Sequence, residues 1–244
     1  IGHDMDGAGL NGSGSLLDEV RISSIPLTPQ QMLCAALQVD FGAAGQQVHP
    51  GFQAFTRSGD IDGPVAATFD SVLGTSGQVT VTVDAENTSN TIDFRDRGDS
   101  SLVNIGELID DQIMNQSGGV QLTLSDLAAG EYLMTTWHHD LSGAADGLLD
   151  ILVSDALGSD RLVADDLAIS TGDNPLNLAQ ASYRLFSDGA SPIVIFFDDA
   201  FSGNVRTPLN AFSLVAVPEP GTFALLLLGC LAMLARRTRA SDLR

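Results

Sequence analysis

Short apolar runs separated by turn-forming residues dominate the chain from residue 38 to residue 215. In one run, Val79, Val81 and Val83 alternate with Thr80 and Thr82, so that apolar side chains face one side of a strand and hydroxyls the other. Many short strands with Gly, Asp, Asn and Ser between them are typical of antiparallel sandwiches. Because no long linker interrupts this stretch, we predict one all-β domain over residues 38–215, an antiparallel β-sandwich.

Twelve segments of this domain have the composition of strands, and one segment has the spacing of a helix. Leu108, Ile109, Ile113 and Met114 recur at helical intervals, which predicts a helix over Ile105–Asn115. The expected strands are Gln38–Phe41, Phe52–Thr56, Val65–Phe69, Gln78–Val83, Ile92–Arg95, Val120–Ser125, Glu131–His138, Leu148–Ser154, Leu162–Ala168, Ser182–Ser187, Ile193–Phe197 and Leu209–Val215.

The chain ends in a proline-containing linker, an uncharged apolar run and a cluster of arginines. The apolar run has good helix formers, and we predict a single C-terminal hydrophobic helix there. A helix of about 13 residues spans only about 20 Å, less than the roughly 30 Å of a bilayer core. A transient sorting signal therefore fits this length better than a permanent anchor. The three parts are Val217, Pro218, Glu219, Pro220 and Gly221, then Phe223–Ala235, then Arg236, Arg237 and Arg239.

This order of Pro-Glu-Pro, leucine-rich helix and arginines over residues 217–239 resembles the PEP-CTERM sorting tail of Gram-negative bacteria. The resemblance implies export across the inner membrane, recognition by an exosortase and removal of the tail, leaving the protein at the cell surface or outside the cell. An exported protein needs a signal peptide, and we expect one upstream of Ile1. A buried core helix or a plain tail anchor is the alternative interpretation.

Residues 1–31 have the pattern of a fragment rather than of a complete domain. Leu10-Asn11-Gly12, followed by a strand pattern from Leu16 to Ser23, is similar to the closing strand of a LamG-like, concanavalin-type jelly roll. That resemblance implies the C-terminal end of such a domain. An ordinary hairpin that leads into the sandwich is the alternative.

The charge of the chain limits the partners that it can bind. It contains 31 acidic residues, 11 arginines and no lysine, for a net charge of −20. Such acidity argues against binding nucleic acid or anionic lipid surfaces and fits an exported protein that is able to bind cations.

The most specific cluster of reactive side chains is Thr135–Asp140, which contains the only tryptophan. It ends a predicted strand and enters a Gly-rich loop, so Trp137, His138 and Asp140 are the candidate ligand-binding residues. Adjacent histidines on a strand point to opposite faces, so we do not expect both to bind one metal. The alternative is a structural histidine at a strand end, bonded to a carboxylate.

Several segments resemble those of galactose-binding-like domains, the fold of many carbohydrate-binding modules. In the strand–turn–strand pattern at 122–132, we expect Leu122 and Leu124 to face the core and Gly130 to take the turn. The resemblance implies a jelly-roll sandwich but transfers no sugar site. Its segments are Val39–Gly42, Pro50–Phe55, Phe94–Gly98, Leu124–Tyr132 and the His-His-Asp stretch.

Two further groups of charged residues have both a structural and a functional interpretation. Asp60, Asp62 and Gly63, and the pair Asp198–Asp199, resemble oxygen donors for a structural Ca²⁺, with solvated loop acids as the alternative that we favour. The arginines of Phe94–Asp99 are able to grip a ligand carboxylate or sugar hydroxyl, but we favour a role in balancing buried carboxylates.

No nucleotide-binding loop, nucleophile elbow, C-x-x-C or H-E-x-x-H pattern occurs in the sequence, which argues against those enzyme classes. We therefore predict a non-catalytic, carbohydrate-binding or adhesive surface protein that binds extracellular polysaccharide. The alternative is a secreted hydrolase of an extracellular polymer that works through His138 and Asp140.

Overall fold

The computed structural model describes residues 36–70, 77–86, 91–98, 106–115, 118–143, 147–173, 178–199 and 206–217. The chain divides into two compact units, Ile1–Leu33 and Cys34–Arg244, and every described residue belongs to the second. The predicted LamG-like fragment and the predicted sorting helix lie outside the described residues. Among the described residues, no helix is long and apolar enough to cross a membrane.

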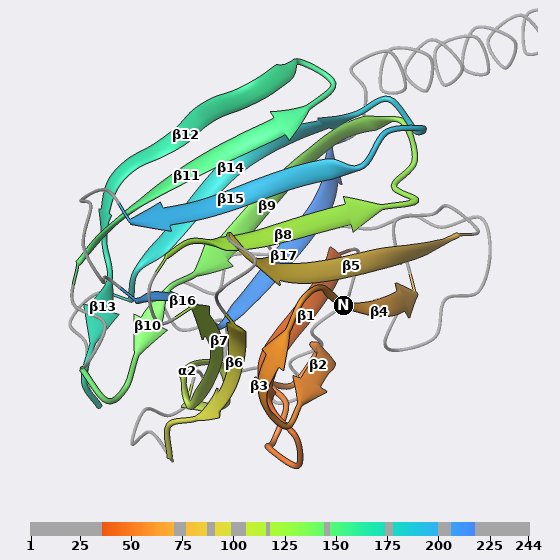
Figure 1. Cartoon of the computed structure of the whole chain (residues 1–244). Coiled ribbons are helices and arrows are strands. Elements are labelled where there is room, and N and C mark those ends of the chain that lie inside the picture. The colour runs from red at the N-terminus through yellow and green to blue at the C-terminus, as the bar shows by residue number, and fades with distance from the viewer. Residues whose placement is uncertain are drawn as a thin grey trace, which may run out of the picture. The chain divides into compact units, whose positions relative to one another are not determined.

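Two large sheets form the layers of a sandwich (Figure 1). The five-stranded sheet has the order β14 (Gln180–Ser187), β9 (Gly130–Trp137), β17 (Ala211–Val217), β1 (Ala36–Ala43) and β2 (Gln53–Arg57). The six-stranded sheet has the order β12 (Gly158–Ala168), β11 (Leu148–Asp155), β15 (Ile193–Asp199), β8 (Val120–Ser125), β5 (Gln78–Ala85) and β4 (Val65–Asp70). Neighbouring strands within these two sheets are antiparallel, except that β1 and β2 are parallel.

Two smaller sheets and one helical turn adjoin this sandwich. One small sheet has the order β16 (Thr207–Leu209), β7 (Asp111–Asn115), β6 (Thr91–Asp96) and β3 (Gly59–Asp62). The other is the parallel pair β10 (His139–Asp140) and β13 (Ser170–Thr171). The helix α2 (Gly106–Ile109) directly precedes β7.

Alternation along the strands explains why the two sheets pack together. On β5 the three valines are buried, while the intervening threonines are only partly covered. On β1 the residues Leu37, Val39 and Phe41 are fully buried and join the same core cluster. Each sheet therefore presents an apolar face to the other, and burial of these faces is the main stabilising term of the fold.

The described structure confirms the predicted antiparallel sandwich and each of the twelve predicted strands, with boundaries that shift by a few residues. Leu122 and Leu124 are fully buried, and Gly130 has a φ of 155° at the start of β9. The helix predicted over Ile105–Asn115 is wrong. Only Gly106–Ile109 is helical, and Asp111–Asn115 is strand β7, whose five residues are all buried.

Candidate functional site

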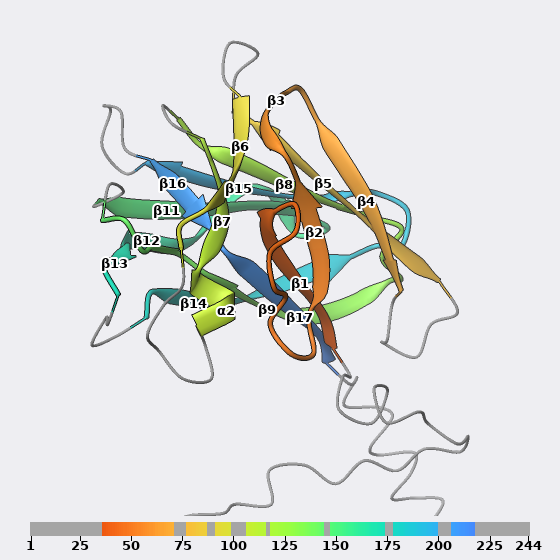
Figure 2. The same cartoon turned by 90° about the horizontal axis from the view of Figure 1, so that it is seen from below.

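One end of the outer face of the five-stranded sheet is covered by α2 and by the loop between β1 and β2. Leu108 and Ile109 of α2 pack with Ala211 of β17 in a small apolar cluster, against which Phe52 and Trp137 also pack. Figure 2 shows α2 on the side of the sandwich that is formed by this sheet. The cover buries side chains that strand alternation alone would leave exposed.

Asp40 is the clearest example of such a buried outward-facing residue. It lies between Val39 and Phe41, which enter the core, so its own side chain points away from the core. It is nevertheless only 2% exposed. Its Oδ2 accepts a hydrogen bond of 2.8 Å from the backbone N–H of His49, and its Oδ1 has no hydrogen-bond partner.

Asp111, the first residue of β7, lies beside Asp40. Gly42 is the next outward-facing position on β1, and a Cβ atom placed on it would lie 1.5 Å from Oδ2 of Asp111. The Asp111 carboxylate therefore rests directly on the backbone of Gly42. Asp111 is 2% exposed, and its Oδ1 has no hydrogen-bond partner.

Burial raises the pKa of Asp40 to about 7 and that of Asp111 to about 8. Desolvation is the largest cause for both, because each charged form loses its hydration. The charge of Asp40 adds to the rise for Asp111, and Asp110 adds to both. Glu107 also raises the pKa of Asp40, whereas the hydrogen bond from His49 lowers it. Burial and the neighbouring acids thus favour the protonated, neutral form of both carboxyl groups.

His138 was predicted as a ligand-binding residue, and the structure places it in the interior with no exposed surface. Its Nδ1 lies 2.9 Å from the carbonyl oxygen of Pro208, which can only accept, so Nδ1 carries the proton. Its Nε2 therefore accepts from the Thr136 hydroxyl at 2.8 Å. Burial lowers the pKa of His138 to about 4, so the ring is neutral at pH 7.

Asp140, also predicted as a ligand-binding residue, is fully buried and paired with an arginine. Its Oδ1 lies 3.3 Å from Nε of Arg97 and accepts hydrogen bonds from the backbone N–H and the hydroxyl of Ser142. Arg95 pairs with Asp93 in the same way. These two contacts confirm that the arginines of this segment balance buried carboxylates.

Asn210 ties the strands around this region together. Its Nδ2 donates to the carbonyl oxygen of Asp111 at 2.8 Å, and its Oδ1 accepts from the N–H of His139 at 2.7 Å. Its backbone carbonyl accepts from Phe41, and its N–H donates to the carbonyl of Trp137. The side chain of this one buried residue therefore binds β7 and β10, and its backbone binds β1 and β9.

Trp137 is half-buried at the border between the covered and the open part of the outer face. Its ring packs edge-on against Phe52, with ring centroids 5.9 Å apart. Strand register places a row of uncharged polar side chains next to it, and Thr135 and Ser182 of this row share a hydrogen bond of 2.8 Å. The row consists of Ser182, Thr135, Ser213 and Gln38 on four neighbouring strands.

The predicted metal residues Asp60 and Asp62 are exposed on β3. The only group of three candidate metal ligands within 4.8 Å of one another among the described residues is Asp150, Asp165 and Asp166. Asp165 and Asp166 are exposed, and one Asp150 oxygen accepts a hydrogen bond from the N–H of Asp166. Both groups are therefore interpreted as acidic side chains exposed to solvent rather than as metal sites.

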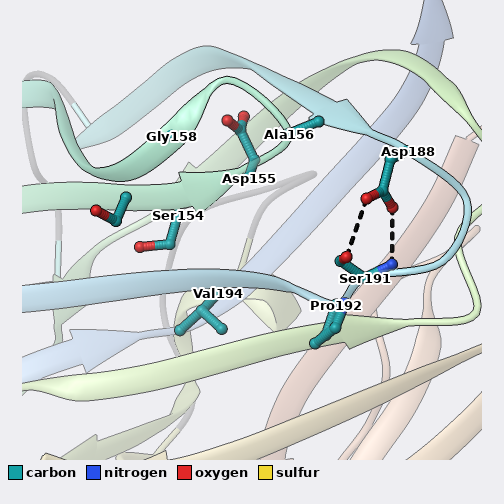
Figure 3. A pocket seen from close by; sticks show the side chains of 9 residues that line it. Ser154, Asp155, Ala156, Gly158, Asp188, Ser191, Pro192 and Val194 are labelled. Carbon is teal, nitrogen blue, oxygen red and sulfur yellow. Dashed lines mark hydrogen bonds between the residues drawn. The ribbon is translucent and has the colours of Figure 1, made fainter.

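A surface hollow of about 400 Å³ lies between the β11–β12 turn and the loop before β15 (Figure 3). Its acids are bonded within the protein. Asp188 accepts from the N–H and hydroxyl of Ser191, and Asp155 accepts from Arg161 at 2.6 Å. These bonds leave the hollow without converging ligand groups.

No protein-family model matches this chain, and no curated protein sequence matches it. Among solved structures it is similar to a family 35 carbohydrate-binding module from Clostridium thermocellum, with 8% identity and a TM-score of 0.35, covering 63% of this chain and 99% of that one. It is also similar to the CBM22-1 xylan-binding domain of Paenibacillus barcinonensis Xyn10C, with 15% identity and a TM-score of 0.36, covering 66% and 89%. A cleaved adhesin domain of Lys-gingipain from Porphyromonas gingivalis has 11% identity and a TM-score of 0.36, covering 64% and 99%. At these values, the fold assignment rests on the strand order and register described above.

Proposed function

We propose that this chain is an exported, non-catalytic carbohydrate-binding protein whose binding surface is the outer face of the five-stranded sheet next to Trp137. The observation that carries the proposal is the partly exposed tryptophan beside a row of hydroxyl and amide groups. Sugar rings offer C–H faces that pack on aromatic rings, and hydroxyls that bond to such polar groups. Because the row carries no charge, it suits an uncharged polysaccharide.

The surroundings of His138 and Asp140 support a non-catalytic role. A hydrolase would need an acid or base that reaches its substrate, whereas both ring nitrogens of His138 are bonded inside the protein and Asp140 is paired with Arg97. The hydrolase alternative, which depended on these two residues, therefore has no observation in its favour.

A glycan array followed by affinity electrophoresis on the best polysaccharide tests the binding surface. Trp137→Ala and Ser213→Ala are expected to weaken binding about tenfold or more, which corresponds to about 1.4 kcal/mol. Thr123→Ala is the matched control, because it removes a hydroxyl from the outward side of the six-stranded sheet. Unfolding curves of each variant separate loss of binding from loss of fold. Equal binding by wild type, Trp137→Ala and Ser213→Ala would reject the surface.

Export and sorting through residues 217–239 belong to the same proposal. Their support is the sequence of the tail, in which Pro218, Glu219 and Pro220 precede an apolar run and three arginines. The protein then occurs at the cell surface or outside the cell without its tail. Fractionation with antibodies against the sandwich and against residues 236–244 tests this. A cytoplasmic protein that retains the arginines would contradict it.

A further inference from the structure

An apolar patch lies on the outer face of the five-stranded sheet, towards the end of β17 and away from Trp137. Leu133 of β9 and Val215 of β17 are 41% and 37% exposed, and they are direct partners in the sheet. Side chains opposite each other on antiparallel strands have Cβ atoms about 5 Å apart, so the two form one surface. Val217, the next outward residue of β17, is partly exposed and extends it. Single exposed apolar residues are ordinary on proteins, whereas adjoining ones indicate a contact surface.

The charged residues at the border of the apolar patch offset each other. Arg184 of β14 is the sheet partner of Leu133 on the side opposite to Val215. Arg184 forms an ion pair with Glu131, the outward residue of β9 that precedes Leu133 by two positions. The patch itself is thus uncharged, and its two neighbouring charges are already paired. This surface favours an apolar occupant over an ionic one.

The chain itself supplies an apolar segment close to the patch. The run Phe223–Ala235 contains no charged residue, and only residues 218–222 separate it from the end of β17. Five residues reach at most about 17 Å, and Gly221 allows the chain to reverse its direction. So short a tether gives the run an effective concentration of about millimolar at the patch. The run therefore reaches the patch before any apolar partner that is free in solution.

The length of the run matches the length of the outer face. Ala211 and Val215 of β17 are the sheet partners of Trp137 and Leu133 of β9, respectively. The distance from Val215 back to Ala211 is four residues, or about 13 Å along the strand. As a helix, the run is about 20 Å long. A run that begins over Val215 and follows β17 backwards therefore crosses the row of polar side chains and ends beyond Trp137.

We propose that, as long as the tail is present, the apolar run Phe223–Ala235 packs on Leu133 and Val215 and covers the outer face as far as Trp137. The contact is driven by removal of both apolar surfaces from water. Removal of the tail then uncovers the polar row, so that processing of the chain controls access to the glycan. This control rests on the glycan-binding surface proposed above, whereas the packing of the run does not.

The chain carries a natural pair of probes for the packing, because Trp137 is its only tryptophan and Cys34→Ser leaves Cys230 as its only thiol. A nitroxide attached to Cys230 quenches tryptophan emission only at short range. In the folded full chain without detergent, emission from Trp137 is expected to fall severalfold and to recover when ascorbate reduces the nitroxide. Leu133→Asp places a charge in the patch and is expected to abolish the quenching. Leu162→Asp is the matched control, because Leu162 is an exposed leucine of the other large sheet, and it should leave the quenching unchanged.

Circular dichroism of each variant establishes that its fold is intact. Emission that is insensitive to the nitroxide, or quenching that persists in Leu133→Asp, would overturn the packing. Quenching that rises with protein concentration would assign the patch to a contact between copies of the chain and equally overturn it.

Glycan affinity of the same unlabelled full-length proteins tests the control of access. Leu133→Asp is expected to bind the polysaccharide about tenfold more tightly than wild type, as is the case when about nine in ten wild-type molecules are covered. Leu162→Asp should bind like wild type. Equal affinities for wild type and Leu133→Asp would show that the run does not shield the surface. Absence of glycan binding by Leu133→Asp, whose outer face is uncovered, would instead reject the binding surface, and the fluorescence result alone would then decide whether the run packs there.

Discussion

Gly42 shows how one missing side chain makes room for a functional group elsewhere. Any Cβ atom at this position would overlap the carboxylate of Asp111, so Asp111 enters its buried position only over a glycine. The constraint is steric and comes from a segment about 70 residues away, which no local pattern around Gly42 reveals.

Gly42→Ala is therefore expected to destabilise the protein by about 1–3 kcal/mol, the usual effect of overpacking. Gly77→Ala is the matched control, because no atom lies within 4 Å of the Cβ that it would add. Urea unfolding of both variants measures the difference. Equal midpoints for Gly42→Ala and Gly77→Ala would show that the Asp111 carboxylate moves aside without cost.

His138 makes stability depend on pH in a defined window. Its pKa is lowered from 6.5 to about 4 by burial, so the unfolded ring takes up a proton near pH 6.5 while the folded ring stays neutral. The stability that it contributes is complete above about pH 6.5 and is lost as the pH falls towards 4, by about 1.4 kcal/mol per pH unit within the window.

His138→Gln removes this titration while it keeps an amide that can both donate and accept. The difference in unfolding free energy between wild type and His138→Gln should be constant above pH 7. Below pH 6, the wild type should lose stability relative to His138→Gln. Groups elsewhere titrate equally in both proteins and cancel in the difference. Curves that stay parallel from pH 7 to pH 4.5 would contradict a neutral buried imidazole.

The sequence singles out Trp137, His138 and Asp140 because a lone tryptophan and adjacent histidines are unusual, but it does not reveal their burial. Asp40 and Asp111 were missed as a pair. On β1, Val39 and Phe41 enter the core, and strand alternation therefore turns the side chain of Asp40 outward. Its burial arises from α2 and the His49 loop, which fold over it from other parts of the chain.

At the scale of elements, period-2 patterns predicted the strands well because each sheet buries one face. The prediction of a helix over Ile105–Asn115 was wrong for a physical reason. Its apolar residues recur at helical intervals, yet in β7 every residue is buried, with β6 and β16 on its two edges. A strand covered on both faces has no alternation by which sequence could distinguish it from a buried helix.

Asn210 provides a prediction at the same scale, since it joins several elements through one side chain. Asn210→Ala leaves the carbonyl of Asp111 and the N–H of His139 without their partner. Each buried group left unsatisfied costs about 1–3 kcal/mol, so a loss of about 2 kcal/mol or more is expected. Ser213→Ala on β17 is the control, and urea unfolding is the measurement. Similar losses in both variants would show that water replaces the Asn210 amide.

At the scale of the whole molecule, the strands at the two ends of the described part of the chain lie side by side in one sheet. The main core cluster extends from Leu37 on β1 to Leu214 on β17, and these two residues are direct partners in the sheet. The first and last strands of the sandwich thus pair with each other. Such closure is a structural reason for the domain to fold without the residues that precede or follow it.

Residues 34–217 expressed alone are therefore expected to unfold in one cooperative transition. Circular dichroism reports the sheets, and fluorescence reports Trp137, the only tryptophan of the chain, so coincident urea transitions from both probes would establish two-state behaviour. The same midpoint is expected when residues 1–33 are restored, because the strands that begin and end this segment already pair with each other. Aggregation of residues 34–217 that is relieved only when residues 1–33 are restored would contradict this. The early predicted strand would then have to be assigned to the sandwich rather than to a LamG-like fragment.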